Sequence, residues 1–209
     1  LVRSRGLGDV YKRQMQRDVL SESFCKNHLS KSSTERLREY REEQRRNGKN
    51  SMKMILTAVN AKYIHSNLAV YTLQASAEKA GVFPEIREFT INQSKDSMLR
   101  SLFLAYADVV CVSCYIWNIS IVEDLITEYH KISPETKIWL GGPEVSYHAE
   151  EMLEQYPFLD GIMKGEGEIT FRELAVYSQN QENGTEGKTL EAVSYTHLRA
   201  HETVLDHVC

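Results

Sequence analysis

Two cysteines, Cys111 and Cys114, stand at the CxxC spacing known from redox and metal sites. A redox dithiol of this spacing belongs at a strand-to-helix turn, where the helix N-terminus stabilises the thiolate. A zinc site of this kind needs two further ligands at compatible spacing, and none lies nearby. Because Cys111 falls inside the apolar run "DVVCVSCY" (108–115), the pattern favours buried structural thiols over a redox or metal site.

The segment "GEGE" (165–168) alternates two glycines with two carboxylates at the exit of an apolar run. Glycine allows a positive φ and close approach of another molecule. Glu166 and Glu168 stand where a helix would begin, a place that favours negative charge. A ligand loop and an ordinary turn into a helix both fit this pattern.

Three other short segments carry unusual residues. Tyr115 and Trp117 in "YIWN" (115–118) either cap the core or form a platform for a large flat ligand. The "GGP" segment (141–143) is either a tight turn or clearance for a ligand, and in the second case Gly142→Val should block binding without disturbing the fold. His65 in "NAKYIHSN" (60–67) is either an ordinary surface residue or a ligand-site residue. No phosphate loop, GxGxxG or Ser-His-Asp order is present, so no catalytic or metal-ligating residue is predicted.

Strand and helix patterns alternate along the chain around these segments. Apolar runs predict five strands, at 54–60, 85–89, 108–115, 137–140 and 160–164. Helical patterns fall at 67–81, 98–106, 119–132, 146–156 and 168–177, with Asn67 and Ser146 as N-caps and Gly81 as a stop. This order predicts an α/β fold, a doubly wound (flavodoxin-like) five-stranded parallel sheet of order 2-1-3-4-5. Such sheets bind ligands outside the carboxyl ends of their strands, where all four unusual loops fall.

Composition narrows the class of protein. No apolar run among the 209 residues approaches the roughly 20 that span a membrane, and no signal peptide is visible, so a cytoplasmic location is expected. Residues 1–51 carry a net charge of +6 and residues 52–209 a net charge of −10. A nucleic-acid partner is not expected, because phosphate contacts need clustered Lys and Arg.

The same shift in composition predicts the domain boundaries. Residues 1–51 are a basic segment outside the core, residues 52–180 form the domain, and residues 181–209 are a tail. Residues 1–14 and 194–209 resemble translated adapter sequence and are expected to lie outside the fold.

Four segments in order carry a family resemblance: "LTAVNAKYIHSNLAVYTL", "VVCVSCYIWNI", "WLGGPEVS" and "GIMKGEGEITFREL". They resemble the N-terminal cobalamin-binding domain of B12-dependent radical SAM proteins, over about residues 53–178. The resemblance implies that cobalamin lies across the carboxyl edge, with its nucleotide tail past the first and third strands and its corrin on the loops. The cofactor-binding residues implied by position are Asn60, Lys62, Tyr63, His65, Ser113, Tyr115, Trp117, Asn118, Gly141, Gly142, Pro143, Gly165 and Glu166.

Two motifs of related proteins are absent from the chain. Without Asp-x-His-x-x-Gly in the first loop, the resemblance implies no protein ligand to cobalt, His65 included. Without CxxxCxxC, the [4Fe-4S] cluster and S-adenosylmethionine belong to a missing C-terminal radical SAM domain of the parent chain. These residues alone are therefore expected to be non-catalytic, and the parent protein is expected to be a radical SAM enzyme.

Two other functions share this architecture. A receiver-like signalling or interaction domain needs carboxylates for Mg²⁺ where this chain has Asn60 and Ser113. A flavodoxin-like FMN binder needs a phosphate loop after the first strand, where this chain has bulky side chains.

Overall fold

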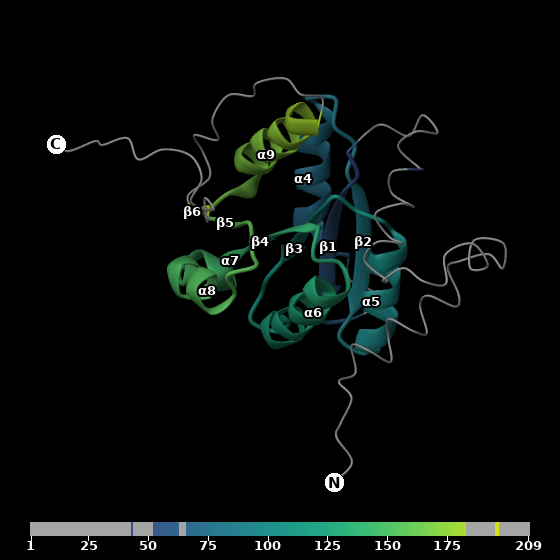
Figure 1. The fold of residues 1–209 in the computed structure, drawn as a ribbon. Helices are drawn as coiled ribbons and strands as arrows, with labels where there is room; N and C mark the ends of the chain where they lie inside the picture. The colour runs from purple at the N-terminus through teal and green to yellow at the C-terminus, as the bar shows by residue number, and fades with distance from the viewer. Residues whose placement is uncertain (1–42, 44–51, 63–65, 183–194, 197–209) are drawn as a thin grey trace, which may run out of the picture.

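A computed structural model gives the fold for residues 43, 52–62, 66–182 and 195–196 (Figure 1). No helix within these ranges is long and apolar enough to cross a membrane.

Five strands pair in parallel to form the sheet, in the order β2-β1-β3-β4-β5, which confirms the predicted topology. The central strands β1 and β3 are buried along their whole length, as expected for a sheet covered on both faces. The strands are β1 (Met54–Asn60), β2 (Glu85–Thr90), β3 (Val109–Ser113), β4 (Lys137–Gly141) and β5 (Gly161–Met163).

A sixth strand, which the sequence did not predict, pairs with the outer edge of β5. It is β6 (Tyr195–Thr196), antiparallel to β5, within a segment expected to lie outside the fold. That expectation is wrong at these two residues. The physical reason is the edge of β5, whose unpaired N–H and C=O groups offer hydrogen bonds to any extended backbone that reaches them.

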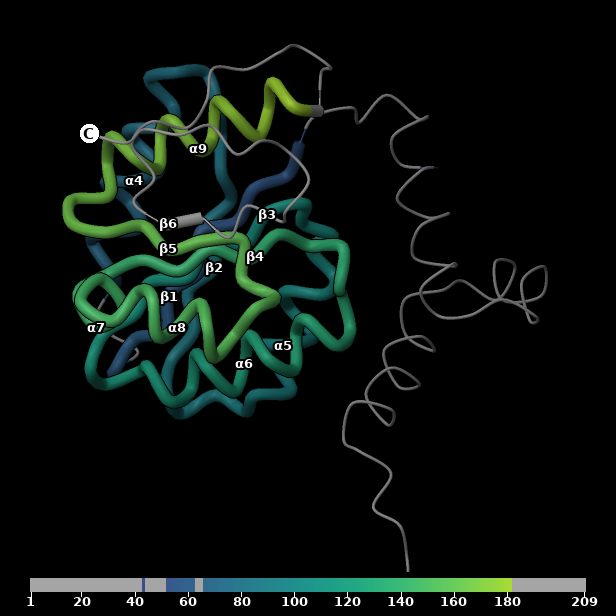
Figure 2. Tube along the Cα trace, turned by 60° about the vertical axis from the view of Figure 1, so that its left-hand side comes forward, coloured from purple at the N-terminus to yellow at the C-terminus, as the bar shows by residue number. Residues whose placement is uncertain are grey.

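Helices cover both faces of the sheet in two layers (Figures 1 and 2). One layer consists of α4 (Leu68–Glu78) and α9 (Gly167–Glu182), which pack side by side. The other consists of α5 (Lys95–Leu104), α6 (Ile119–Ile132) and α8 (Ala149–Gln155). Each layer packs on its own buried apolar cluster, and the cluster beneath α4 and α9 is the smaller of the two.

Local signals explain where α4 begins and stops. The Asn67 side chain accepts a hydrogen bond from the Ala69 N–H, as predicted for an N-cap. After α4 the chain turns at Gly81, whose φ of 80° is costly for other residues.

The helix predicted at 146–156 with Ser146 as its cap is wrong, because the structure has two shorter helices there. The first, α7 (Pro143–Ser146), begins directly after Gly142 with a proline, whose fixed φ suits a first helical position. Ser146 ends this helix, and its hydroxyl donates to the Gly142 carbonyl at 2.7 Å. The second helix, α8, has His148 at its N-cap position with no side-chain cap bond.

Candidate functional site at the carboxyl edge of the sheet

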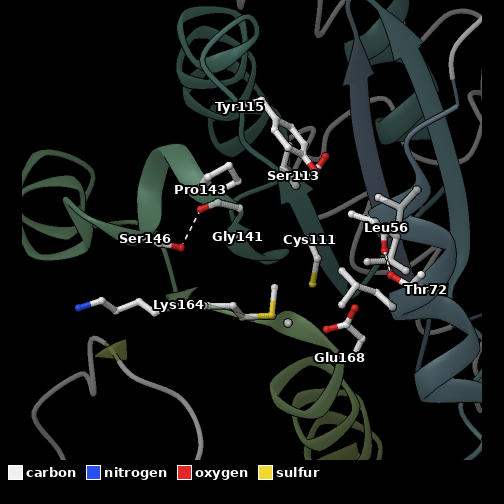
Figure 3. Close-up of a pocket in the computed structure, with 18 of the residues that line it drawn as sticks. Leu56, Thr72, Cys111, Ser113, Tyr115, Gly141, Pro143, Ser146, Lys164 and Glu168 are labelled. Atoms are coloured by element: carbon white, nitrogen blue, oxygen red, sulfur yellow. Dashed lines mark hydrogen bonds between the residues drawn. The ribbon is translucent and has the colours of Figure 1, made fainter.

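A cavity of about 590 Å³ lies at the carboxyl edge, between the sheet and the α4 and α9 layer (Figure 3). We call it the carboxyl-edge cavity; it is lined by parts of β1, α4, β3, β4, α7, β5 and the start of α9. Its volume lies within the roughly 300–1,000 Å³ typical of small-molecule sites.

The cavity lies where three neighbouring strands carry small residues in one register row near their carboxyl ends. In the last register row, Ala58 lies beside Ser113, Ser113 beside Gly141 and Gly141 beside Met163. Side chains alternate between faces along a strand, so this whole row faces α4 and α9. Only Met163 is large in this row, and the small residues Ser113 and Gly141 leave the space that the cavity occupies.

The structure brings six of the predicted site residues together around the cavity and leaves the others elsewhere. The six that line it are Ser113, Tyr115, Gly141, Gly142, Pro143 and Gly165. Those that do not line it are Asn60, Lys62, Trp117, Asn118 and Glu166. Tyr63 and His65 lie outside the described residues.

Tyr115 and Trp117 form one aromatic unit at the cavity mouth. Their rings stack with centroids 4.5 Å apart and planes 8° apart. Tyr115 is half-buried in the wall, whereas Trp117 is 49% exposed. The pair extends the wall of the cavity outward as a flat surface.

The Asn118 side chain holds the loop after β3 in place. Its side chain is 1% exposed, its Oδ1 accepts from the Tyr115 N–H at 2.8 Å, and its Nδ2 donates to the carbonyls of Val59 and Ser113. These bonds fix the loop after β3 against β1, so Asn118 shapes the site without facing it.

Asn60 and Lys62 also lie away from the cavity. Asn60 Nδ2 donates to Glu88 Oε1 at 2.8 Å, and Lys62 is exposed on the loop after β1. Partial burial raises the pKa of the Glu88 carboxyl. Hydrogen bonds from the Asn67 backbone and from the Tyr71 and Asn60 side chains outweigh this effect, so that the pKa falls below its ordinary value.

The two central glycines play different parts, and one expectation about them is wrong. Gly142 has φ 111° and ψ 171°, and a Cβ there would lie 2.4 Å from the Cys114 carbonyl oxygen. Its missing side chain therefore makes room for the protein's own backbone rather than for a ligand. Gly141 has room, since a Cβ there would meet the Met163 side chain at 3.4 Å, an ordinary contact.

The "GEGE" segment is both a turn and a part of the cavity wall. Gly165 has φ 73° and open space around it, as a turn requires. Gly167 begins α9 where a Cβ would lie 3.0 Å from Leu73, so glycine allows α9 to approach α4 closely. Glu168 lines the cavity from the first turn of α9, while Glu166 is exposed outside it.

Sequence reasoning missed the wall that α4 provides and the end of β5. On α4 the lining residues recur along one face, which the helical pattern alone could not assign to a cavity. Lys164 follows β5, and its side chain extends away from Cys111 and Leu56 (Figure 3). The missed lining residues include Ala69, Val70, Thr72, Leu73, Ser146, Tyr147, Met163 and Lys164.

Both cysteines of the CxxC segment are buried and free of disulfide bonds, as the structural interpretation predicted. Burial raises the pKa of the Cys111 thiol well above its ordinary range, and burial raises that of Cys114 to about 12. Among the described residues, no three His, Cys, Asp or Glu side chains gather in a way that could hold a metal ion.

We expect both thiols to resist alkylation by iodoacetamide at about pH 8, because the thiolate is the reactive form and burial suppresses it. Peptide mapping after brief treatment of the folded chain should show Cys111 and Cys114 unmodified, and both modified after unfolding in guanidinium. Modification of Cys111 in the folded chain at the rate of a free thiol would contradict its structural assignment.

Comparison with known proteins gives one family match and several partial likenesses. The family model described as B12 binding domain matches residues 54–175. A cobalamin-dependent radical SAM methyltransferase, TokK of Streptomyces tokunonensis, is 37% identical over 70 residues, which are 32% of this chain and 10% of TokK. A 2-(S-pantetheinyl)-carbapenam-3-carboxylate methyltransferase of Streptantibioticus cattleyicolor is 36% identical over 72 residues, which are 33% of this chain and 10% of that protein.

The aligned segments therefore span about a tenth of the length of these two curated relatives. Among solved structures, the cobalamin-dependent S-adenosylmethionine radical enzyme OxsB aligns at 19% identity with a TM-score of 0.47, covering 65% of this chain and 20% of OxsB. That TM-score is too low to support an argument. The family match covers more than half of the chain and contains every wall of the carboxyl-edge cavity, from Leu56 on β1 to Glu168 on α9. The chain therefore belongs to the B12-binding domain family.

Proposed function

We propose that residues 52–180 bind cobalamin across the carboxyl edge, as the cofactor-binding module of a longer B12-dependent radical SAM enzyme. The observation that carries the proposal is the carboxyl-edge cavity, which lies at the strand ends where doubly wound sheets bind ligands. Family membership gives the identity of the ligand.

The residues present fit the nucleotide tail of cobalamin better than its corrin ring. A cavity of about 590 Å³ suits a tail of nucleotide size, and the macrocycle would lie outside it. Apolar side chains dominate the inner wall, and the Ser113 hydroxyl adds a polar group. The stacked Tyr115 and Trp117 rings and the loop from Gly141 to Pro143 would face the macrocycle at the mouth.

Bound cobalamin supplies radical or group-carrier chemistry that amino acid side chains lack. The residues of this chain would bind and orient it and keep water from its tail. We propose that cobalamin binds here without a protein ligand to cobalt, because the loop after β1 lacks the Asp-x-His-x-x-Gly motif.

We infer that a second domain of the same parent protein covers this edge. Large apolar side chains are exposed around the cavity mouth, at the starts of α4 and α9 and in the loops after β3 and β4; they are Leu68, Ile116, Trp117, Tyr147 and Ile169. A radical SAM domain, with its [4Fe-4S] cluster and S-adenosylmethionine, would lie over these residues in a cytoplasmic enzyme. The much greater length of the two curated relatives supports this arrangement.

Within the part of the chain that the structure describes, the residues at the ends of β1 and β3 do not favour the receiver-like alternative. At the carboxyl edge Asn60 is bonded to Glu88, and Ser113 offers a hydroxyl rather than a carboxylate. Phosphoryl transfer would need carboxylates at these two positions to hold Mg²⁺.

The test is a titration of hydroxocobalamin into the 209-residue chain, followed by visible absorbance and calorimetry. Cobinamide, which keeps the corrin but lacks the nucleotide tail, is the matched control ligand. We expect saturable binding of hydroxocobalamin and at least tenfold weaker binding of cobinamide, since only the first can fill the cavity. No binding of either at millimolar concentration would refute the function, and equal binding of both would refute the placement of the tail.

We expect Tyr115→Ala to weaken hydroxocobalamin binding by about tenfold. The substitution removes one ring of the stacked pair and part of the cavity wall, and large flat ligands gain affinity from such contacts. The matched control is Phe83→Ala, which removes an exposed aromatic ring just before β2, at the opposite end of the strands. Equal affinities for both variants would show that the aromatic pair does not contact the ligand.

A further inference from the structure

Glu88 does not line the carboxyl-edge cavity, yet its carboxylate joins both ends of the loop beside it. Its Oε1 accepts from the Asn67 N–H at 2.7 Å and from Asn60 Nδ2 at 2.8 Å, and its Oε2 accepts from the Tyr71 hydroxyl at 2.7 Å. Asn60 ends β1 and Asn67 precedes α4. One partly buried carboxylate on β2 therefore sets where β1 ends and where α4 begins.

These contacts also fix which way the Asn67 amide points. Its Oδ1 accepts from the Ala69 N–H at 3.1 Å, so that Nδ2, the donor end, faces the Ser113 hydroxyl oxygen at 3.1 Å. The reversed amide would place two donors against each other at Ala69. Both Asn67 and Ser113 are 9% exposed, so water competes little for this bond.

The bond from Asn67 determines what Ser113 offers to a ligand. A hydroxyl has one hydrogen to donate and lone pairs that accept. Because Asn67 donates to the Ser113 oxygen, the hydrogen of that hydroxyl is left for another acceptor. Ser113 lines the cavity, so the hydrogen is available to a molecule bound there (Figure 3).

We propose that Glu88 and Asn67 are positioning residues that make Ser113 a hydrogen-bond donor to an oxygen or nitrogen acceptor of the ligand in the cavity. The proposal rests on the proposed function, because cobalamin is the ligand used to test it. It assigns a role in binding to a β2 carboxylate that touches no part of the cavity.

The test compares the affinities of single and double variants for hydroxocobalamin. Ser113→Ala removes the donor, and we expect about tenfold weaker binding. Glu88→Ala keeps the Ser113 hydroxyl but removes the carboxylate that holds Asn67 in place. We expect about fivefold weaker binding. If Glu88 acts through Ser113, the double variant should bind no more weakly than Ser113→Ala alone, since coupled residues are not additive.

Glu85→Ala is the matched control for an effect on stability alone. Glu85 is a partly exposed carboxylate on the same strand, at its amino end, where it pairs with Lys53 at 3.0 Å and with Arg87. Removing it should lower the unfolding midpoint to a similar extent and leave the affinity unchanged. Glu88→Gln should keep the affinity within about twofold, because its Oε1 can still accept from Asn67 and the Tyr71 hydroxyl can reverse its bond.

Asn67→Ser gives an independent variant should Glu88→Ala fail to fold. Serine keeps the N-cap of α4 but has no amide to donate to Ser113. We expect several-fold weaker binding with little change in the unfolding midpoint.

Three results would overturn the proposal. The first is unchanged affinity in Glu88→Ala, and the second is an equal loss of affinity in Glu88→Ala and Glu85→Ala. The third is a double variant whose affinity falls below that of Ser113→Ala by the full factor seen for Glu88→Ala alone. Failure of the unsubstituted chain to bind would instead refute the proposed function, and this assignment with it.

Discussion

Replacing Gly142 by alanine is expected to lower the free energy of unfolding by about 3 kcal/mol or more. Two costs combine at this residue. Its φ of 111° and ψ of 171° lie in a region that only glycine occupies readily. A Cβ would also lie 2.4 Å from the Cys114 carbonyl oxygen, and Cys114 is held in place by a bond from its N–H to the Gly141 carbonyl at 2.7 Å. Denaturant unfolding monitored by circular dichroism measures the loss.

Gly165→Ala is the matched control for this effect. Gly165 also has a positive φ, 73°, but nothing lies within 4 Å of its Cβ position. Only the backbone cost applies there, so we expect a loss of about 1 kcal/mol. An equal loss of unfolding free energy at the two glycines would show that the contact with Cys114 relaxes. The backbone conformation alone would then set the cost.

Replacing Gly141 by leucine is expected to weaken hydroxocobalamin binding by at least 100-fold with a small change in stability. Gly141 faces the cavity from the end of β4, and its φ lies outside the region that disfavours side chains. A Cβ there meets only the Met163 side chain, at 3.4 Å. The rest of a leucine side chain would occupy space that the ligand needs.

Gly141→Ala completes this series, because it adds the Cβ without filling the cavity. We expect its affinity to stay within about threefold of the unsubstituted chain. Titration measures the affinity of both variants and thermal unfolding measures their stability. Together they distinguish a blocked cavity from a destabilised fold. Undiminished binding by Gly141→Leu would show that the ligand does not enter between β4 and α9.

The sheet could be predicted because its signals are local. Apolar runs of strand length alternate with helical patterns, and right-handed crossovers leave few topologies for such an order. The helix boundaries after β4 could not be predicted as well. The choice between a cap at Ser146 and a start at Pro143 depends on the backbone of Gly142, and that conformation depends on packing against β3.

The site was predictable at the strand ends and not elsewhere. Ser113, Tyr115 and Gly141 could be found because loops after parallel strands meet at one edge. The wall from α4 depends on its packing against α9, about 100 residues away in the chain. Asn118 and Glu88 could not be assigned either, because both are polar residues whose partners lie on other strands and loops. A residue type alone does not tell whether its hydrogen bonds serve a ligand or the fold.

The position of the cavity inside the smaller apolar cluster has a consequence for the life of the protein in the cell. The face under α5, α6 and α8 has a complete core of its own, whereas the α4 and α9 face surrounds the site. A molecule bound there would complete the packing of this face, and it would stabilise the folded state by an amount that grows with the logarithm of its free concentration. Without its ligand, the chain would therefore be less stable on this face and more often partly unfolded. Proteases and chaperones would act first on the α4 and α9 layer, and the vitamin supply would set how much of the protein survives.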